Sequence, residues 1–266
     1  GKGWSAHKAI CKIKKKERES EREKEKATAQ GGGSGGDGGS GSGSGGGSGL
    51  GDMWAIMATL IAHQPLRSRG EQLWNACFED QYEKLKKILQ QIGSDIDWAE
   101  PESGATSANV AALRGYDKCL ELLISYGANL SLVAKDGNAP IHEACMKGRY
   151  TCLELLANST TVNLRISDEQ GNTPAMLCSQ NGHAKCLGLL SDRGADLNFA
   201  NYDGQTPAHS ACQHGQLKCL QLLGKRGADL SKKDGKGTTP LEHARVYGHP
   251  ECIDYLLANG ATGGQS

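Results

Sequence analysis

A repeat of 33 or 34 residues constrains this chain of 266 residues more than any other feature. Its glycines fall in two series that keep the same intervals, Gly104, Gly137, Gly171, Gly204, Gly237 and Gly115, Gly148, Gly182, Gly215, Gly248. A fixed period of this length is typical of stacked supersecondary units, each of which buries its apolar face against its neighbours. We therefore expect a solenoid.

The residues of one unit predict a helix, a turn, a second helix and a hairpin loop. Three units start the first helix with a hydroxyl residue and a proline, Thr173-Pro174, Thr206-Pro207 and Thr239-Pro240. The hydroxyl suits the N-cap, and proline suits the first helical position because its missing N–H is not needed there. Small residues in this helix allow neighbouring helices to approach closely, namely Ala111, Ala144, Ala211 and Ala244. The second helix is rich in leucine and ends at a Gly-Ala pair such as Gly194-Ala195.

The unit resembles the ankyrin repeat, whose pattern is Gly-x-Thr-Pro-Leu-His followed by small residues and a later Gly-Ala-Asp. The stretch Gly204-Gln-Thr-Pro-Ala-His209 shows the resemblance, which covers roughly residues 71–263. It implies an all-α ankyrin-repeat solenoid of helix-turn-helix units joined by hairpin loops. We count five clear repeats and a degenerate sixth, which lacks the turn glycine as a terminal capping unit does, at about 101–133, 134–167, 168–200, 201–233, 234–263 and 71–100.

Two departures from the pattern fall in the repeat at 134–167. Ala139 stands where the capping threonine is expected, and losing that hydroxyl costs a helix about 1 kcal/mol. The stretch Asn158-Ser-Thr-Thr-Val-Asn163 replaces Gly-Ala-Asp, so we expect a locally irregular hairpin.

Four segments are predicted before the repeats. Residues 12–30 are highly charged and favour a solvated, partly frayed helix, with a partner contact, a nuclear-targeting signal or a nucleic-acid contact as alternatives. Residues 31–49 are Gly or Ser except Asp37, so 31–52 form a flexible linker with a span of roughly 25 Å. Residues 53–70 include an apolar stretch that is too short to cross a bilayer; we expect a cap on the repeat stack, with partner docking as the alternative.

The linker and the start at Gly1 suggest a fragment or an engineered fusion. In that case residues 1–30 are a foreign peptide tethered to the repeats at an effective concentration of roughly millimolar. A natural low-complexity spacer is the alternative.

Residues 1–11 contain Trp4-Ser-Ala-His7-Lys8-Ala-Ile-Cys11, which resembles the end of a MYND zinc finger. The resemblance implies that His7 and Cys11 are the last two ligands of a zinc site. The upstream cysteines of such a finger are absent, so zinc is expected only in an intact finger. The finger belongs to the parent of the repeats or to a fused partner, and a MYND-containing protein is a candidate partner.

The net charge and the cysteine positions limit the class of partner and the cellular compartment. The formal net charge is zero, which argues against a dedicated nucleic-acid binder, and no apolar run is long enough for a membrane span. Nine of the ten cysteines fall in repeat slots that suit small buried apolar residues, and reduced thiols suit an intracellular compartment, cytoplasmic or nuclear. We expect a monomer.

The histidines do not form a catalytic pattern. His142 and His209 fall at the histidine of the ankyrin pattern, where the family implies that the ring braces neighbouring turns, and His183 and His249 follow the turn glycine as in the family. His214 and His243 are off the pattern. None lies at a recurring spacing from a nucleophile and an acid, so we expect no enzyme in these residues.

The resemblance implies a protein-binding scaffold whose partner contacts the hairpin tips and the concave face of the first helices. By family position the contact residues are Lys135, Asn138, Met146, Lys147, Asn172, Gln180, Asn181, Tyr202, Gln205, Gln213, His214, Val246 and Tyr247. The partner is another protein or residues 1–30 in cis. The alternative is a regulatory arm of an enzyme whose catalytic domain lies outside this chain.

Overall fold

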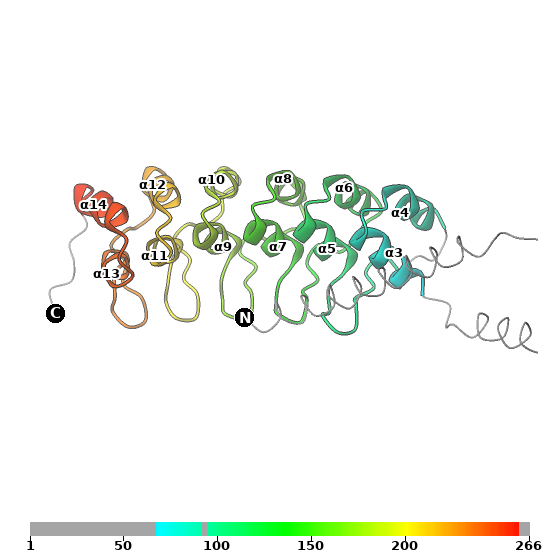
Figure 1. Cartoon of the computed structure of the whole chain (residues 1–266), viewed down its shortest axis with the longest axis horizontal. Helices are drawn as coiled ribbons and strands as arrows, with labels where there is room; N and C mark the ends of the chain where they lie inside the picture. Colours follow the sequence, from blue (N-terminus) through cyan, green and yellow to red (C-terminus); the bar gives the residue numbers. More distant parts are fainter. Residues whose placement is uncertain (1–67, 92–94, 261–266) are drawn as a thin grey trace, which may run out of the picture. The chain divides into compact units, whose positions relative to one another are not determined.

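The computed structural model describes residues 68–91 and 95–260, and this part of the protein consists of six helix pairs (Figure 1). The pairs are α3 Arg69–Phe78 and α4 Tyr82–Leu89, α5 Ser107–Arg114 and α6 Asp117–Ser125, α7 Pro140–Lys147 and α8 Tyr150–Asn158, α9 Pro174–Asn181 and α10 Ala184–Asp192, α11 Pro207–Gln213 and α12 Leu217–Lys225, and α13 Pro240–Val246 and α14 Pro250–Ala258. The predicted segments 1–11, 12–30 and 31–52, and most of 53–70, lie outside these residues.

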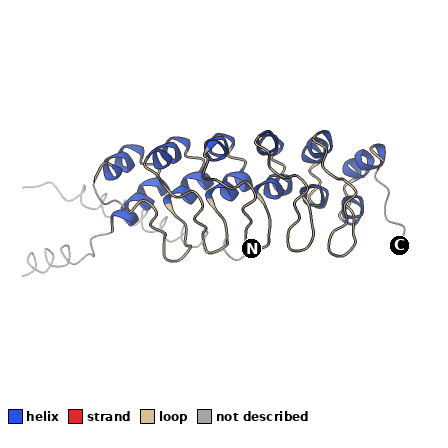
Figure 2. Cartoon of the chain, turned by 180° about the vertical axis from the view of Figure 1, so that it is seen from behind, coloured by secondary structure: helices blue, strands red, loops and turns tan. Residues whose placement is uncertain are grey.

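The pairs stack so that their first helices form one row and their second helices another (Figure 1). Long loops connect each pair to the next and extend from the row of first helices. Figure 2 shows only helix and loop in the described ranges, and the extended pairing there is a single bridge between Ala99 and Thr106. The predicted all-α solenoid is confirmed.

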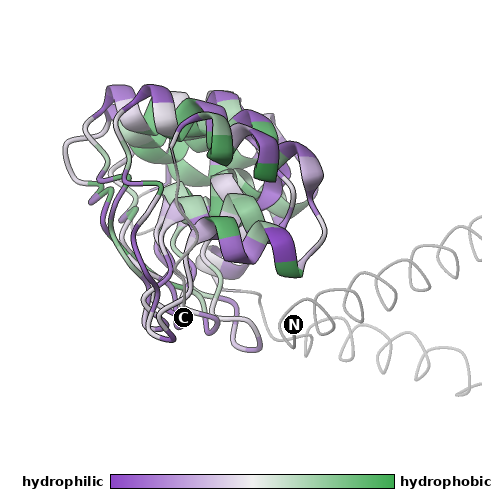
Figure 3. Cartoon of the chain, turned by 90° about the vertical axis from the view of Figure 1, so that its left-hand side faces the viewer, coloured by the Kyte–Doolittle hydropathy of each residue, from purple (hydrophilic) through white to green (hydrophobic). Residues whose placement is uncertain are grey.

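The core lies between the two rows of helices, where the apolar colouring is concentrated (Figure 3). The second helices contribute leucines that are fully buried, namely Leu120, Leu123, Leu153, Leu156, Leu187, Leu190, Leu220 and Leu223. The first helices contribute the predicted small residues, Ala111, Ala144, Ala211 and Ala244, each without exposed surface. Burial of this continuous apolar layer is what holds one repeat to the next.

The predicted helix starts are right in position, but their hydrogen bonds differ from one repeat to another. Proline is the first residue of α7, α9, α11 and α13. The hydroxyl of Thr239 accepts the N–H of Glu242 at 3.3 Å, as an N-cap does. The hydroxyl of Thr206 instead lies 2.9 Å from Nδ1 of His209, and that of Thr173 is buried with no partner among the described residues.

The turn between the two helices of a pair requires one residue in the left-handed backbone conformation. The predicted glycines adopt this conformation, for example Gly115 with φ 82° and Gly148 with φ 64°. In the first pair Asp80 occupies the equivalent place with φ 55°, a conformation that is costly for a residue with a Cβ atom. The degenerate repeat therefore carries backbone strain that the others avoid.

The predicted irregularity near residues 158–163 is present. Helix α8 ends at Asn158, and Ser159 continues in an extended conformation with ψ 129° rather than through a left-handed glycine. The guanidinium of Arg193, from the next pair, donates to the side-chain oxygen of Asn158. This contact ties the irregular end to its neighbour.

Candidate partner-binding surface

The predicted contact residues lie in the loops before the first helices and in the C-terminal parts of those helices or directly after them. We call this the loop-side surface and define it by Lys135, Met146, Lys147, Gln180, Asn181, Tyr202, Gln205, Gln213, His214, Val246 and Tyr247. These residues come from four consecutive helix pairs, starting with α7 and ending with α13. The periodic fold thus aligns side chains that are far apart in sequence.

Three large apolar or aromatic side chains stand out on the loop-side surface. Tyr202 is 78% exposed, Val246 77% and Tyr247 51%. The hydroxyl of Tyr247 accepts a hydrogen bond from the amide of Gln213 at 3.3 Å, which links the ends of α13 and α11. The surface therefore presents aromatic area near polar groups, the combination that protein interfaces use.

Two predicted contact residues are buried instead and brace the loops. The amide of Asn138 donates to the carboxylate of Asp136 at 2.9 Å. The amide of Asn172 donates to the carboxylate of Asp168 at 3.1 Å, and its oxygen accepts from Asn201 of the next loop at 3.0 Å. Their partners are thus other residues of the loops, and we leave Asn138 and Asn172 out of the loop-side surface.

Several members of the loop-side surface also make contacts within the protein. Lys135 donates its ammonium to the carbonyl of Pro101 at 2.7 Å. Gln205 is half-buried, as are Met146, Lys147, Gln180 and Gln213. His214 and Asn181 are exposed, and Nδ1 of His214 lies 3.0 Å from the carbonyl of Ser210 in its own helix. The exposed apolar and aromatic area of this surface is concentrated at Tyr202, Val246 and Tyr247.

The repeat histidines join neighbouring repeats as the ankyrin pattern implies. Nδ1 of His209 accepts the N–H of Thr206, and its Nε2 lies 3.0 Å from the carbonyl of Thr238 in the next repeat. His142 accepts the N–H of Ala139 in the same way, and its Nε2 lies 3.0 Å from the carbonyl of Ile166 in the loop between α8 and α9. His183 and His249 connect the second helix of one pair to the preceding pair through the carbonyls of Met146 and Gln213. The predicted bracing role of His142 and His209 is confirmed.

Comparison with known proteins identifies the family of this chain. A family model described as ankyrin repeats in three copies matches residues 73–168, 160–234 and 203–265, well over half of the chain. The chain belongs to the ankyrin repeat family. The solved structure of EF0377, an ankyrin repeat protein, is similar with a TM-score of 0.66 at 27% identity, covering 73% of this chain and 98% of that one. An ankyrin repeat domain from Acinetobacter baumannii AYE has a TM-score of 0.64 at 28% identity, covering 71% and 98%.

The curated relatives of this ankyrin repeat chain are longer proteins. Human ankyrin repeat and SOCS box protein 16 is 31% identical over 147 residues, which is 52% of this chain and 32% of that protein. The target of rapamycin complex 2 subunit AVO2 of Saccharomyces cerevisiae is 32% identical over 108 residues, 40% of this chain and 25% of that protein. The chain thus spans a third or less of the length of these two relatives.

The MYND resemblance receives no support from these comparisons, because the family matches begin at residue 73. His7 and Cys11 lie outside the described residues. Within the described ranges, every helix is too short or too polar to cross a membrane.

Sequence reasoning missed two residues that replace the bracing histidine. In the repeat that starts at α5, the side chain of Asn109 accepts the N–H of Thr106 at 3.0 Å and donates to the carbonyl of Asn138 at 2.9 Å. In the last repeat, Glu242 accepts the N–H of Thr239 at 2.7 Å. A signal existed, because both residues fall three positions after the capping threonine, as His209 does after Thr206.

Burial shifts the ionisation of three side chains in the first helices. Burial lowers the pKa of His142 and of His209, which keeps both imidazoles neutral and able to accept a backbone N–H. Burial, helped by the charge of Asp136 and opposed by Lys147, raises the pKa of Glu143 to about 8. Glu143 is therefore mostly protonated at neutral pH.

The nine cysteines of the described residues are free and buried, as predicted from their repeat slots. Burial raises the pKa of Cys212 and of Cys252, so these thiols stay protonated at neutral pH. They act as small apolar residues of the core.

Proposed function

We propose that the ankyrin repeats bind a protein partner along the loop-side surface, with Tyr202, Val246 and Tyr247 as the main anchors. The exposure of these three side chains is the observation that carries the proposal. Exposed tyrosines lose little conformational entropy on binding and bury a large area, so they tend to dominate interface energetics.

Hydrogen bonds between successive loops hold this surface in place before a partner arrives. The N–H of Lys135 donates to the carbonyl of Ser103 at 2.8 Å, and that of Gly235 to the carbonyl of Asp203 at 2.8 Å. A third link joins Tyr202 to Gln170 at 3.3 Å. A preorganised surface loses less entropy on association, which favours binding.

Repeat proteins generally use extended surfaces of this kind to bind other proteins. The yeast relative AVO2 is named as a subunit of target of rapamycin complex 2. We include a role within a protein assembly in the proposal for this chain.

A finer proposal is that residues 1–30 occupy the same surface in cis. The Gly/Ser composition of residues 31–49 provides a tether that raises their local concentration to roughly millimolar. Within that segment, His7 and Cys11 remain proposed zinc ligands of an intact MYND-type finger, and a MYND-containing protein remains a candidate partner. The nine buried free thiols support a reducing, intracellular compartment for the chain.

Site-specific photo-crosslinking tests both proposals in one experiment. A photoreactive amino acid replaces Tyr247 in one variant and, as a matched control, Tyr126 at the end of α6 in another; Tyr126 is 44% exposed. The proposal predicts a defined crosslinked species from position 247 and none from position 126. Mass spectrometry of the crosslinked peptide then separates attachment to residues 1–30 from attachment to another protein. Equal crosslinking from both positions would contradict a loop-side binding surface.

A further inference from the structure

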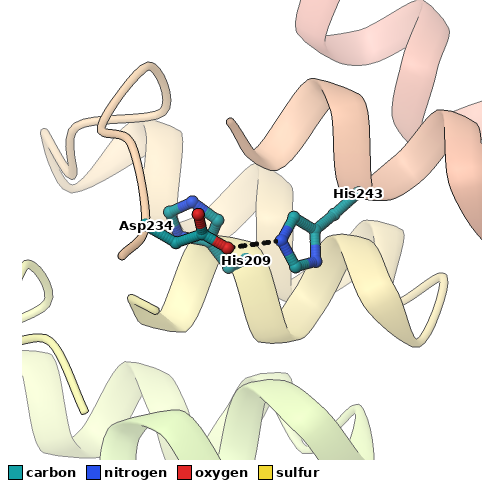
Figure 4. A group of neighbouring side chains, drawn as sticks. All are labelled: His209, Asp234 and His243. Atoms are coloured by element: carbon teal, nitrogen blue, oxygen red, sulfur yellow. Dashed lines mark hydrogen bonds and ion pairs between the residues drawn. The ribbon is translucent and has the colours of Figure 1, made fainter. Parts of the chain in front are cut away.

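Three side chains with metal-ligating atoms come together where the last two repeats meet (Figure 4). His209 lies on α11, His243 on α13, and Asp234 in the loop between the two repeats. One ligand atom from each lies within 4.8 Å of the other two. In the part of the chain that the structure describes, this is the group of three or more potential metal ligands that lie so close together. All three are buried. We propose that His209, Asp234 and His243 bind one divalent transition-metal ion of the zinc class.

The donor set suits such an ion. Two imidazole nitrogens and one carboxylate oxygen are ligands that zinc accepts in three-ligand sites, in which water takes the fourth position. Nε2 of His243 already lies 3.0 Å from Oδ2 of Asp234, about the separation of two ligands on one tetrahedral ion. The ring of His209 packs edge-on against that of His243 with centroids 5.2 Å apart, and one of its nitrogens lies within 4.8 Å of the ligand atoms of Asp234 and His243.

The other repeats show that this combination is not a general requirement of the fold. Where the α7 and α9 repeats meet, the equivalent positions hold His142, Asp168 and Leu177, so the third residue is apolar. Where the α9 and α11 repeats meet, they hold Met176, Asn201 and Ser210. Each ligand of the proposed site therefore has a natural replacement at the same position of the same chain.

His243 is difficult to explain by packing alone. Its side chain is buried, and its Nδ1 atom has no hydrogen-bond partner among the described residues. A buried polar atom without a partner costs free energy that leucine, the residue at this position in the α9 repeat, avoids. Coordination through Nε2 would leave Nδ1 without a partner, but the metal–ligand bond would offset the cost of burying the ring.

Metal binding would exchange one bracing bond of His209 for coordination. Without metal, Nε2–H donates to the carbonyl of Thr238, and Nδ1 accepts the N–H of Thr206. With metal on Nε2, the imidazole proton moves to Nδ1, where the hydroxyl oxygen of Thr206, 2.9 Å away, accepts it. The N–H of Thr206 then loses its acceptor, a cost that the metal–ligand bonds would have to offset. The carbonyl of Thr238 keeps the hydrogen bond that it accepts from the N–H of Asp234 at 2.9 Å. The ion would thus join two repeats without leaving a buried carbonyl unpaired.

Cobalt titration of the full-length chain tests the proposal, because Co²⁺ replaces Zn²⁺ and its absorption spectrum reports the ligands. The proposal predicts one Co²⁺ bound per chain, a visible spectrum typical of nitrogen and oxygen ligands, and displacement by Zn²⁺. It also predicts that Zn²⁺ raises the melting temperature, because an ion that binds only the folded state stabilises it.

Two substitutions copy the neighbouring repeats and so preserve the fold. The side-chain oxygen of Asn201 accepts two backbone N–H groups of its loop, as that of Asp234 does, so Asp234→Asn should keep these bonds. His243→Leu introduces the leucine that the chain has at the equivalent position 177. Each variant should bind Co²⁺ at least tenfold more weakly and lose the Zn²⁺-dependent rise in melting temperature. The matched control Asp168→Asn, in the repeat with leucine as third residue, should leave both readouts unchanged.

A double variant, His7→Ala with Cys11→Ser, removes the other candidate zinc ligands and should retain the cobalt spectrum. Circular dichroism checks that each variant is folded. If Asp234→Asn does not fold, the test rests on His243→Leu. Unchanged affinity in His243→Leu, no binding by the unmodified chain, or a sulfur-to-cobalt charge-transfer band would overturn the proposal.

Discussion

His142 joins the start of α7 to the loop between α8 and α9 by placing Nε2 3.0 Å from the carbonyl oxygen of Ile166. The same ring accepts the N–H of Ala139 through Nδ1 at 3.0 Å, which fixes the proton on Nε2. One neutral imidazole thus satisfies a buried donor before α7 and a carbonyl in the loop between α8 and α9. The loop-side surface depends on such links, because they set the spacing of the loops that carry it.

Replacing His142 with alanine should destabilise the stack. The change leaves two backbone groups without partners and removes a fully buried ring, so we expect a loss of about 2–4 kcal/mol in the free energy of unfolding. His142→Asn is the matched control, because Asn109 makes both types of bond at the same position of its repeat. It should cost clearly less than alanine in urea denaturation at pH 8, and equal losses would show that the bonds contribute little.

The same pair of variants predicts a pH dependence. Burial holds the pKa of folded His142 below its unfolded value of about 6.5, so the unfolded chain takes up a proton first as the pH falls. The contribution of His142 is full above about pH 6.5 and is lost on acidification towards the folded pKa. The unfolding free energy of the unmodified chain should therefore fall faster than that of His142→Asn between pH 7 and 5, as measured by urea denaturation. Parallel pH profiles would contradict the assignment.

Glu143 predicts the opposite pH dependence. Its folded pKa of about 8 lies above its unfolded value, so its stabilising contribution is present below about pH 4.5 and is lost as the pH rises towards 8. Glu143→Gln removes the ionisation and should raise the unfolding free energy by about 1–3 kcal/mol at pH 7.5. At pH 4.5 the variant and the unmodified chain should have the same stability. A constant difference across this range would instead indicate a packing effect.

Asp80 predicts a stabilising substitution in the first helix pair. Asp80→Gly removes a left-handed residue with a Cβ atom and should raise the unfolding free energy by about 1 kcal/mol. Asp80→Asn tolerates this conformation and should have little effect. Thermal denaturation followed by circular dichroism measures both, and a loss of stability in Asp80→Gly would mean that the contact between the carboxylate and the thiol of Cys119 outweighs the strain.

The fold was predictable because it repeats. The glycine series and the Thr-Pro helix starts recur from repeat to repeat, and each occurrence predicts the same helix pair. A local departure such as Ala139 therefore does not change the fold. The cysteine slots and the bracing histidines follow from the same alignment of repeats.

The site was less predictable because burial and contacts across repeats decide it. Asn138 and Asn172 occupy positions that vary at the surface of the family, yet hydrogen bonds to Asp136 and Asp168 turn their side chains into the loops. The meeting of His209, Asp234 and His243 depends on the offset between two repeats, which the spacing within one repeat does not show.

The most direct measurement of the central claim is the affinity of the crosslinked partner for paired variants of the full chain. If Tyr202 and Tyr247 are anchors, the double change to alanine should weaken binding at least about 30-fold, a loss of about 2 kcal/mol. The control pair, Tyr126→Ala with Tyr150→Ala, removes tyrosines that are 44% and 43% exposed, directly after α6 and at the start of α8, and should leave the affinity unchanged. An unchanged affinity in the first pair, or a loss in the control pair, would contradict binding at the loop-side surface.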